Sequence, residues 1–465
     1  MHPLPTALLL GWLCSALAAD PASPIPAALR QGPPLPGEPL DGWPGLLPTP
    51  AVRTEALDLG AVLAQASATS PRLAEARART EAAELAAQAA GRPSNPSLEL
   101  ELEPEEEGPR LEATLELSLS NLVFAPLRAA AARPLATATG LRGAEEQARF
   151  RLEVSSAWYG LVAAEQRLRL AQQSLDTLAA AVEVAEARQV SGSATRLERS
   201  AHRAAFESAR GEVAVLELER RRAASALQQI TGLSPEILAG PLALDFPELP
   251  PQPPLPPQLG AEAARRSLGL AAGREQSQAL LRQASLLRIE RRSPDLSLGL
   301  RNGWSLGAPA DEQAPGELAV IAHLSLPLLD RGTRGAASLD AGAAAEQART
   351  AALSDEVHAV AQHLSHRLWT AHARMQHEEQ ITQPAWAEVS HETLRAYNAM
   401  QVGVYELLAA RRQELLAALT LVDARHAYWT ASVELDALLA GALPEAAPAA
   451  DTRTPGSTAA PSGGH

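Results

Sequence analysis

The chain has 465 residues, with 40 basic and 54 acidic side chains and a formal net charge of −14. Every basic residue is arginine, alanine and leucine dominate, and aromatic residues make up only 3%. This composition favours long helices. The acidic balance, without a basic patch rich in aromatic residues, argues against nucleic-acid binding. The single cysteine, Cys14, excludes a disulfide scaffold and a cysteine-ligated metal site.

The first residues have the pattern of a signal peptide. Residues 7–17 are apolar, Ala16-Leu17-Ala18 offers a cleavage site, and the stretch is too short to span a bilayer. We therefore expect a signal peptide over residues 1–18, export of the chain, and a Pro-rich linker over residues 19–53. Cys14 lies within the apolar part of this signal and is interpreted as part of it, not as a lipid anchor. No later segment is long and apolar enough to predict a transmembrane helix.

The rest of the sequence predicts two similar halves. The first, residues 54–240, has a helical segment, alternating strands at about 97–103 and 110–119, and a long helical region that breaks near Gly192. A Pro-rich linker over 241–258 leads to the second half, residues 259–441. Its strands are expected at about 294–301 and 317–326, and its long helical region breaks near Gly403. Residues 442–465 are expected to form a disordered tail.

Recurring landmarks indicate that the two halves arose by duplication. Trp158 and Trp369 are 211 residues apart, and Gly192 and Gly403 are also 211 apart. The glycines that end the two long helical regions, Gly232 and Gly441, are 209 apart. Residues 330–401 are expected to form one rod of about 105 Å. Apolar residues seven apart predict coiled-coil packing, at Leu161, Leu168, Leu175 and Val182 and again at Leu408, Leu415, Val422 and Trp429.

The strands alternate between apolar and polar residues. One face would carry Leu98, Leu100, Leu102, Leu111, Leu115, Leu117, Leu296, Leu298, Leu300, Leu318, Val320 and Leu324. The other would carry Ser297 and the glutamates Glu99, Glu101, Glu103, Glu112 and Glu116. This pattern is typical of a transmembrane β-barrel, although a small soluble sheet over a core shows it too. Four strands cannot close a barrel, whereas three copies of the chain would supply twelve.

At this point the sequence resembles the TolC-type outer membrane factors, especially their heavy-metal efflux (CzcC-like) branch, over about residues 54–441. The resemblance rests on the repeated order of helix, hairpin and long helix pair, on the Pro-Leu-Leu-Asp-Arg-Gly segment at 327–332, and on Tyr397, Gly403 and Leu408 at the second break. It implies a mixed fold, in which a trimeric twelve-stranded barrel in the outer membrane continues as an α-helical periplasmic tube.

The resemblance also implies a function. Such a homotrimer is the passive exit duct of a tripartite efflux system, in contact with outer-membrane lipid, a periplasmic adaptor (membrane fusion) protein and an inner-membrane pump. Metal cations are one candidate substrate, and no enzymatic activity and no cofactor are expected. The helical breaks would dock the adaptor, through Gly192, Leu197, Val402, Gly403, Tyr405 and Leu408. Gly192 and Gly403 would supply the backbone freedom that reverses the chain, and the strand glutamates would face the lumen, either to wet it or to favour cations.

Two further patterns are compatible with other functions. Gly303–Gly307 matches the G-x-S-x-G hydrolase motif, but it lies between two strands and precedes a loop without the helix that a nucleophile elbow requires, so we expect an exposed loop. Six histidines fall within residues 358–391, and His363 and His366 form an i, i+3 pair, but tight ligand spacing is absent and no bound metal is expected. The alternatives are a soluble periplasmic coiled-coil scaffold and an exported hydrolase that uses Ser305.

Overall fold

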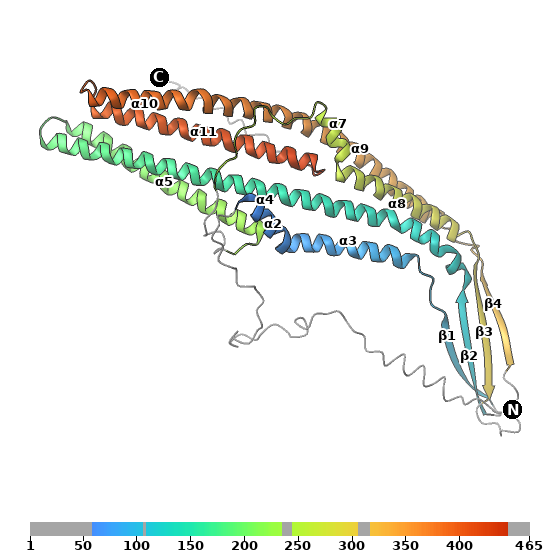
Figure 1. Cartoon of the computed structure of the whole chain (residues 1–465). Helices are drawn as coiled ribbons and strands as arrows, with labels where there is room; N and C mark the ends of the chain where they lie inside the picture. Colours follow the sequence, from blue (N-terminus) through green and yellow to red (C-terminus); the bar gives the residue numbers. More distant parts are fainter. Residues whose placement is uncertain (1–57, 106–107, 235–243, 306–316, 445–465) are drawn as a thin grey trace, which may run out of the picture. The chain divides into compact units, whose positions relative to one another are not determined.

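The computed structural model describes residues 58–105, 108–234, 244–305 and 317–444. The expected signal peptide, the N-terminal linker, Cys14 and all but three residues of the expected tail lie outside this part. The described residues form long helices that run alongside one another and a four-stranded sheet at one end of them (Figure 1).

The same order of elements occurs twice. In the first half it is α2 (Leu59–Thr69), α3 (Pro71–Ala90), β1 (Ser97–Glu105), β2 (Gly108–Ser118), α4 (Leu119–Val190) and α5 (Arg196–Thr231). In the second half it is α7 (Leu259–Arg266), α8 (Leu268–Glu290), β3 (Asp295–Ser305), β4 (Glu317–Ser325), α9 (Thr333–His377), the π-helical turn η2 (Glu378–Thr382), α10 (Gln383–Asn398) and α11 (Val404–Leu439). The two halves close alike, because Gly232 and Gly441 both adopt positive φ after α5 and α11.

The four strands form one antiparallel sheet in the order β1-β2-β3-β4. The hairpins of the two halves are joined edge to edge, because β2 pairs with β3, with Leu115 opposite Leu300. Leu98 is in turn opposite Leu115, and Leu300 is opposite Val320. Since side chains of paired residues lie on the same face of a sheet, this register places all twelve predicted apolar residues on one face.

The strands extend further toward the hairpin turns than the alternation predicts. β1 continues through Pro104 to Glu105, and β3 continues through Gly303 to Ser305, because backbone pairing with β2 does not require alternating side chains. Pro104 is tolerated since β1 is an edge strand. At the other end, Leu119 belongs to α4 and not to β2. Ser118 caps that helix by accepting a hydrogen bond from the Asn121 N–H at 3.2 Å.

The two long rods differ. α4 is unbroken from Leu119 to Val190, although Pro126 and Pro134 lie inside it. The second rod, expected as one helix, contains the π turn η2, which ends two residues before Pro384. Proline cannot donate the i to i−4 hydrogen bond, so a wider turn at this point costs less. The turn is held against α11, since Glu378 accepts a hydrogen bond from Thr420 and Glu379 pairs with Arg425.

Four of the chain's few aromatic residues lie together where the two halves meet. Trp429 on α11 packs against the buried cores of both halves. Its ring stacks on Tyr159 of α4 with centroids 5.8 Å apart, and Tyr159 stacks on Phe246 of the inter-repeat segment at 5.9 Å. On its other side Trp429 meets Tyr428 edge-on at 5.2 Å. We call these four residues the aromatic seam.

The landmark tryptophans are not equivalent in the structure. Trp158 is 2% exposed in the core, whereas Trp369 is 54% exposed. The spacing of 211 residues therefore indicated the duplication correctly but paired the wrong positions. Loop residues 326–332 separate β4 from α9, whereas β2 is followed directly by α4, and the π turn adds one residue to the second rod. A constant spacing in the sequence therefore does not mark equivalent positions in the two rods.

The aromatic seam predicts where stability is concentrated. We expect Trp429→Ala to lower the free energy of unfolding by about 3 kcal/mol, because it removes a large side chain shared by two cores. The exposed Trp369→Ala should cost less than about 1 kcal/mol. Denaturant unfolding of both variants, followed by far-ultraviolet circular dichroism, compares them. Equal losses would show that the seam has no special role.

Candidate functional site

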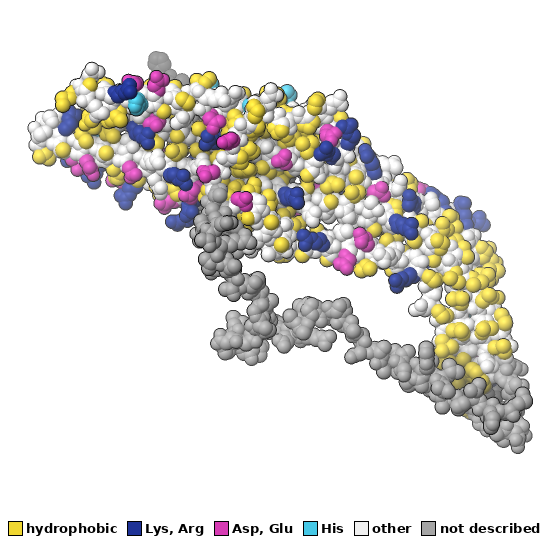
Figure 2. All heavy atoms as spheres, viewed as in Figure 1, with side chains coloured by type: hydrophobic (Ala, Val, Ile, Leu, Met, Phe, Trp, Pro, Cys, Tyr) yellow, Lys and Arg dark blue, Asp and Glu magenta, His cyan; other side chains and the backbone are white. Residues whose placement is uncertain are grey.

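The apolar face of the sheet is uncovered within the described part of the chain. Its exposed large side chains are Leu98, Leu100, Leu102, Leu115, Leu298, Leu300, Trp304, Leu318, Val320 and Leu324. Figure 2 shows these strands as a continuous apolar surface beside the charged helical part. Contiguous apolar patches of this kind mark contact with lipid or protein. In addition, β1 and β4 are both edge strands in the sheet as described, so each has one row of backbone groups without a partner strand.

The opposite face is polar but less acidic than the sequence suggests. Glu112 pairs with Arg110 at 3.3 Å and with Arg301 at 3.4 Å. Glu116 accepts a hydrogen bond from Ser297 and lies 3.9 Å from His323. The two arginines that neutralise Glu112 are residues that alternation also places on this face, but they were not predicted as its partners.

The three glutamates of β1 differ from those of β2. Glu99, Glu101 and Glu103 are exposed along the edge strand, and none has an ion pair with another described residue. Their side chains project to the same face because they are two residues apart. Of the five predicted glutamates, these three form an acidic row without ion pairs to described residues, which we call the unneutralised row, although the register places Arg110 of β2 opposite Glu103.

The G-x-S-x-G motif is part of a strand where it is described. Gly303, Trp304 and Ser305 pair with Glu112, Leu111 and Arg110 of β2, and the rest of the motif lies outside the described residues. The expected exposed loop is thus wrong for its first three residues, since β3 is longer than predicted. A residue within a strand lacks the sharp strand-to-helix turn that presents a nucleophilic serine.

The histidines of α9 and α10 do not form one cluster. His363 and His366 are exposed, whereas His372 is buried on the opposite side of α9, where its Nε2 lies 2.9 Å from the Pro250 carbonyl oxygen. Among the described residues, no group of three His, Cys, Asp or Glu side chains could hold a metal ion. In the same part of the chain, no helix combines the length and apolar character needed to cross a bilayer.

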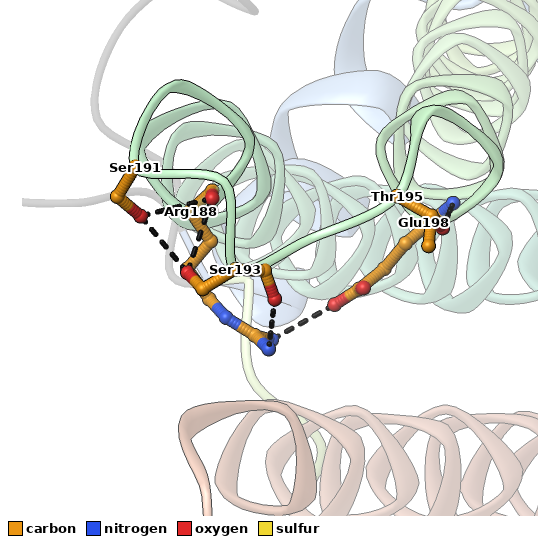
Figure 3. Close-up of polar contacts among 5 residues, drawn as sticks. All are labelled: Arg188, Ser191, Ser193, Thr195 and Glu198. Carbon is orange, nitrogen blue, oxygen red and sulfur yellow. Dashed lines mark hydrogen bonds and ion pairs between the residues drawn. The ribbon is translucent and has the colours of Figure 1, made fainter.

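The first helical break is a compact turn between α4 and α5. Gly192 adopts φ of +75°, as the chain reversal requires. Arg188 donates hydrogen bonds to Glu198 at 2.8 Å and to the Ser193 carbonyl at 3.1 Å (Figure 3). Thr195 accepts from the Glu198 N–H at 3.1 Å, which starts α5. Thr195-x-x-Glu198 is a capping-box pattern, a signal that the sequence analysis missed.

The second break, between α10 and α11, uses different residues. Gly403 is the residue before α11 and has φ of −84°, which any residue can adopt. The left-handed residue is Met400, with φ of +59°. The expectation that Gly403 reverses the chain is therefore wrong. Met400 follows the end of α10 as Gly192 follows the end of α4, so the equivalent positions are three residues off the shared spacing of 211.

The two breaks contact each other through Tyr405. Its ring stacks on His202 of α5 with centroids 4.5 Å apart, and the Arg188 guanidinium lies 5.2 Å from its centre. Tyr405 therefore links α4, α5 and α11. Stacking and cation–π contacts of this kind contribute about 1 kcal/mol each.

Around this link the breaks expose apolar side chains. Leu197 is 80% exposed and Met400 94% exposed, and Val190 is also exposed. Of the other predicted docking residues, Gly192 and Gly403 are exposed, whereas Val402, Tyr405 and Leu408 are half-buried. The structure thus brings residues of both breaks to one end of the helices. Arg188, His202, Val190 and Met400 belong to the same surface but were not predicted.

Comparisons with known proteins bear on the fold. No protein-family model and no curated protein matches the chain. Among solved structures, the outer-membrane channel OprN is 19% identical, covering 82% of this chain and 90% of its own, with a TM-score of 0.63. The Campylobacter jejuni CmeC outer membrane channel is 13% identical, covering 84% and 87%, with a TM-score of 0.67. The Neisseria gonorrhoeae MtrE outer membrane channel is 18% identical, covering 83% and 89%, with a TM-score of 0.62. These structures confirm the predicted chain fold of long helices and four strands.

The Tyr405 link predicts how the two breaks are coupled. Tyr405→Ala should speed amide hydrogen exchange in residues 399–408 by about tenfold, because it removes the contacts with His202 and Arg188. Tyr405→Phe should leave exchange unchanged, since the hydroxyl is buried without a hydrogen-bond partner among the described residues. Exchange measured by mass spectrometry tests both variants. An equal effect of the two substitutions would contradict a role for the ring.

Proposed function

We propose that three copies of this chain form an outer-membrane channel, the passive exit duct of a tripartite efflux system. The four-stranded sheets would pool into a twelve-stranded barrel, and the helices would continue its wall into the periplasm. The observation that carries this proposal is a sheet with one uncovered apolar face and two edge strands in the described part of the chain. The solved structures of like fold are described as outer membrane channels, which supports the same role here.

Two costs favour closure in lipid. Leaving a large apolar side chain in water forgoes about 1.5–3 kcal/mol, and ten such side chains are exposed on this face. Unpaired strand edges also invite pairing with any other strand. Joining β1 of one copy to β4 of the next satisfies both edges, and lipid around the barrel covers the apolar face. Three copies give twelve strands, within the range in which barrels close.

The turns at the other end of the helices suit a protein partner. We propose that they dock a periplasmic adaptor, which connects the duct to an inner-membrane pump. Leu197 and Met400 offer exposed apolar contacts, and the Tyr405 link holds the two breaks together as one surface. Gly192 and Gly403 allow close approach, because they carry no side chain. The half-buried Val402 and Leu408 would support this surface from beneath.

The polar face of the sheet would line the lumen and favour cations. Glu99, Glu101 and Glu103 form the unneutralised row, which three copies would repeat as rings, and acidic rings concentrate cations. This supports cations among the substrates, with metal cations as the narrower proposal of the CzcC-like branch. His363 and His366 lie exposed on α9 as an i, i+3 pair and would bind such ions only transiently.

Cross-linking tests the trimer. In a Cys14→Ser background we substitute Leu100→Cys on β1 and Val320→Cys on β4, and treat membranes with a thiol cross-linker that spans about 10 Å, roughly two strand spacings. We expect bands that end at the trimer, because the two edges of neighbouring copies meet. As a control, Leu115→Cys with Leu300→Cys pairs within one chain and should yield only monomer. Monomers alone, or an open ladder of larger species, would contradict the proposal.

Conductance tests the acidic row. Glu99→Gln with Glu101→Gln should lower the cation-to-anion permeability ratio several-fold in planar bilayers, because negative charge leaves the lumen. Arg301→Gln should raise the ratio, since it removes a positive charge from the same face. An unchanged ratio in both variants would show that this face does not line the conducting path.

A further inference from the structure

The segment between β4 and α9, residues 326–332, exposes leucines where the sheet meets the helices. Leu328 is 73% exposed, Leu329 is fully exposed, and Leu326 is also exposed. Leu324 at the end of β4 is exposed on the apolar face, and Leu326 lies two residues further along the chain. The leucines therefore extend the apolar surface of the sheet to its rim. We call Leu326, Leu328 and Leu329 the leucine loop.

The loop has a defined conformation. The Leu328 N–H donates a hydrogen bond to the Leu326 carbonyl at 2.9 Å, and the Gly332 N–H donates to Asp330 at 2.9 Å. Gly332 has φ of +65° and lies so close to Arg291 that a Cβ at this position would be 2.8 Å from the Arg291 side chain. The loop is thus fixed against the end of α8. No described residue buries its leucines.

Four arginines gather at this contact. Arg291 and Arg292 follow α8, and Arg331 and Arg334 flank Gly332, and all four are exposed. Arg291 has one ion pair, with Asp330 at 3.9 Å, and the other three have none with a described residue. Figure 2 shows basic side chains gathered where the helices meet the apolar strands. Like charges held together repel one another, and three of these four lack an ion-pair partner among the described residues, which favours a bound anion.

The carboxylates nearby do not cancel this charge. Glu290 pairs with Arg128 at 2.7 Å, and Asp330 is shared with Arg291. Together with Asp295, these groups line a neighbouring pocket of about 540 Å³ at the junction of sheet and helices. Arg128 and Arg291 also line that pocket, but its three carboxylates outnumber these two guanidinium groups and disfavour an anion there. The anion would instead be held on the outer surface, by the arginines that adjoin the leucine loop.

We propose that the leucine loop and these arginines form a site for anionic phospholipid in the leaflet nearest the helices. The leucines would enter the acyl region, and Arg291, Arg292, Arg331 and Arg334 would bind the phosphate groups. Apolar side chains next to arginines are the pattern that binds anionic membrane surfaces. The order along the chain fits, because the apolar sheet, the leucines and the arginines follow one another from the membrane outward. This inference rests on the proposed function, which places the sheet in lipid.

Lipid retention tests the arginines. The full-length protein is purified in mild detergent and equilibrated with phosphatidylglycerol or phosphatidylcholine of matched chains, and bound lipid is counted by native mass spectrometry. An arginine near an anionic surface strengthens binding by roughly fivefold, so we expect at least about that preference for phosphatidylglycerol. Changing all four arginines to glutamine should abolish the preference. The control changes Arg220, Arg221 and Arg222 of α5 to glutamine and should keep it.

A second pair of variants tests the leucines. Leu328→Ser with Leu329→Ser should reduce retention of both lipids, whereas Leu197→Ser with Met400→Ser at the helical breaks should not. Glycerol 1-phosphate should compete poorly, because it lacks acyl chains, and equal competition would overturn the assignment to lipid. A trimeric membrane protein without phosphatidylglycerol preference, or with the preference intact in the four-arginine variant, would refute this inference alone. A chain that stays in water without detergent would refute the proposed function as well.

Discussion

The structure depends on one unmet requirement, that of a four-stranded sheet with an uncovered apolar face and two edge strands in the described part of the chain. Backbone groups at the two edges need partners, and the leucines need a medium other than water. The helices do not supply either, since they lie at one end of the sheet and not over its face (Figure 1). Closure with other copies, inside lipid, as proposed above, would meet both needs at once.

The rest of the chain is arranged around that sheet. Joining β2 to β3 places the two halves side by side, and α4 leaves the sheet directly at Leu119, capped by Ser118. The helices then pack along their length, and the aromatic seam joins their cores through Trp429. The seam unites four of the chain's few aromatic residues, so it is a strong contact between the two halves. At the far end Tyr405 performs the same task for the two breaks.

Local sequence patterns predicted most of the fold correctly. Alternation placed the leucines and glutamates on opposite faces, and heptads at Leu161 and Leu415 identified buried stripes. What failed depends on contacts distant in sequence or on small insertions. The pairing of Glu112 with Arg301 follows from the register between the two hairpins, which no local pattern fixes, whereas Arg110 lies two residues from Glu112 on the same strand. The role of Met400 in place of Gly403 follows from a three-residue shift that spacing concealed, and the π turn follows from a proline whose effect depends on α11.

The most direct test of the central claim is the environment of successive residues along β1. Spin labels at positions 98–103, introduced one at a time in a Cys14→Ser background, report collisions with oxygen in lipid and with a water-soluble nickel chelate. A sheet that separates lipid from a water-filled lumen predicts alternation with a period of two, in which Leu98, Leu100 and Leu102 favour oxygen and Glu99, Glu101 and Glu103 favour the chelate. Equal access of the chelate to all six positions would contradict it.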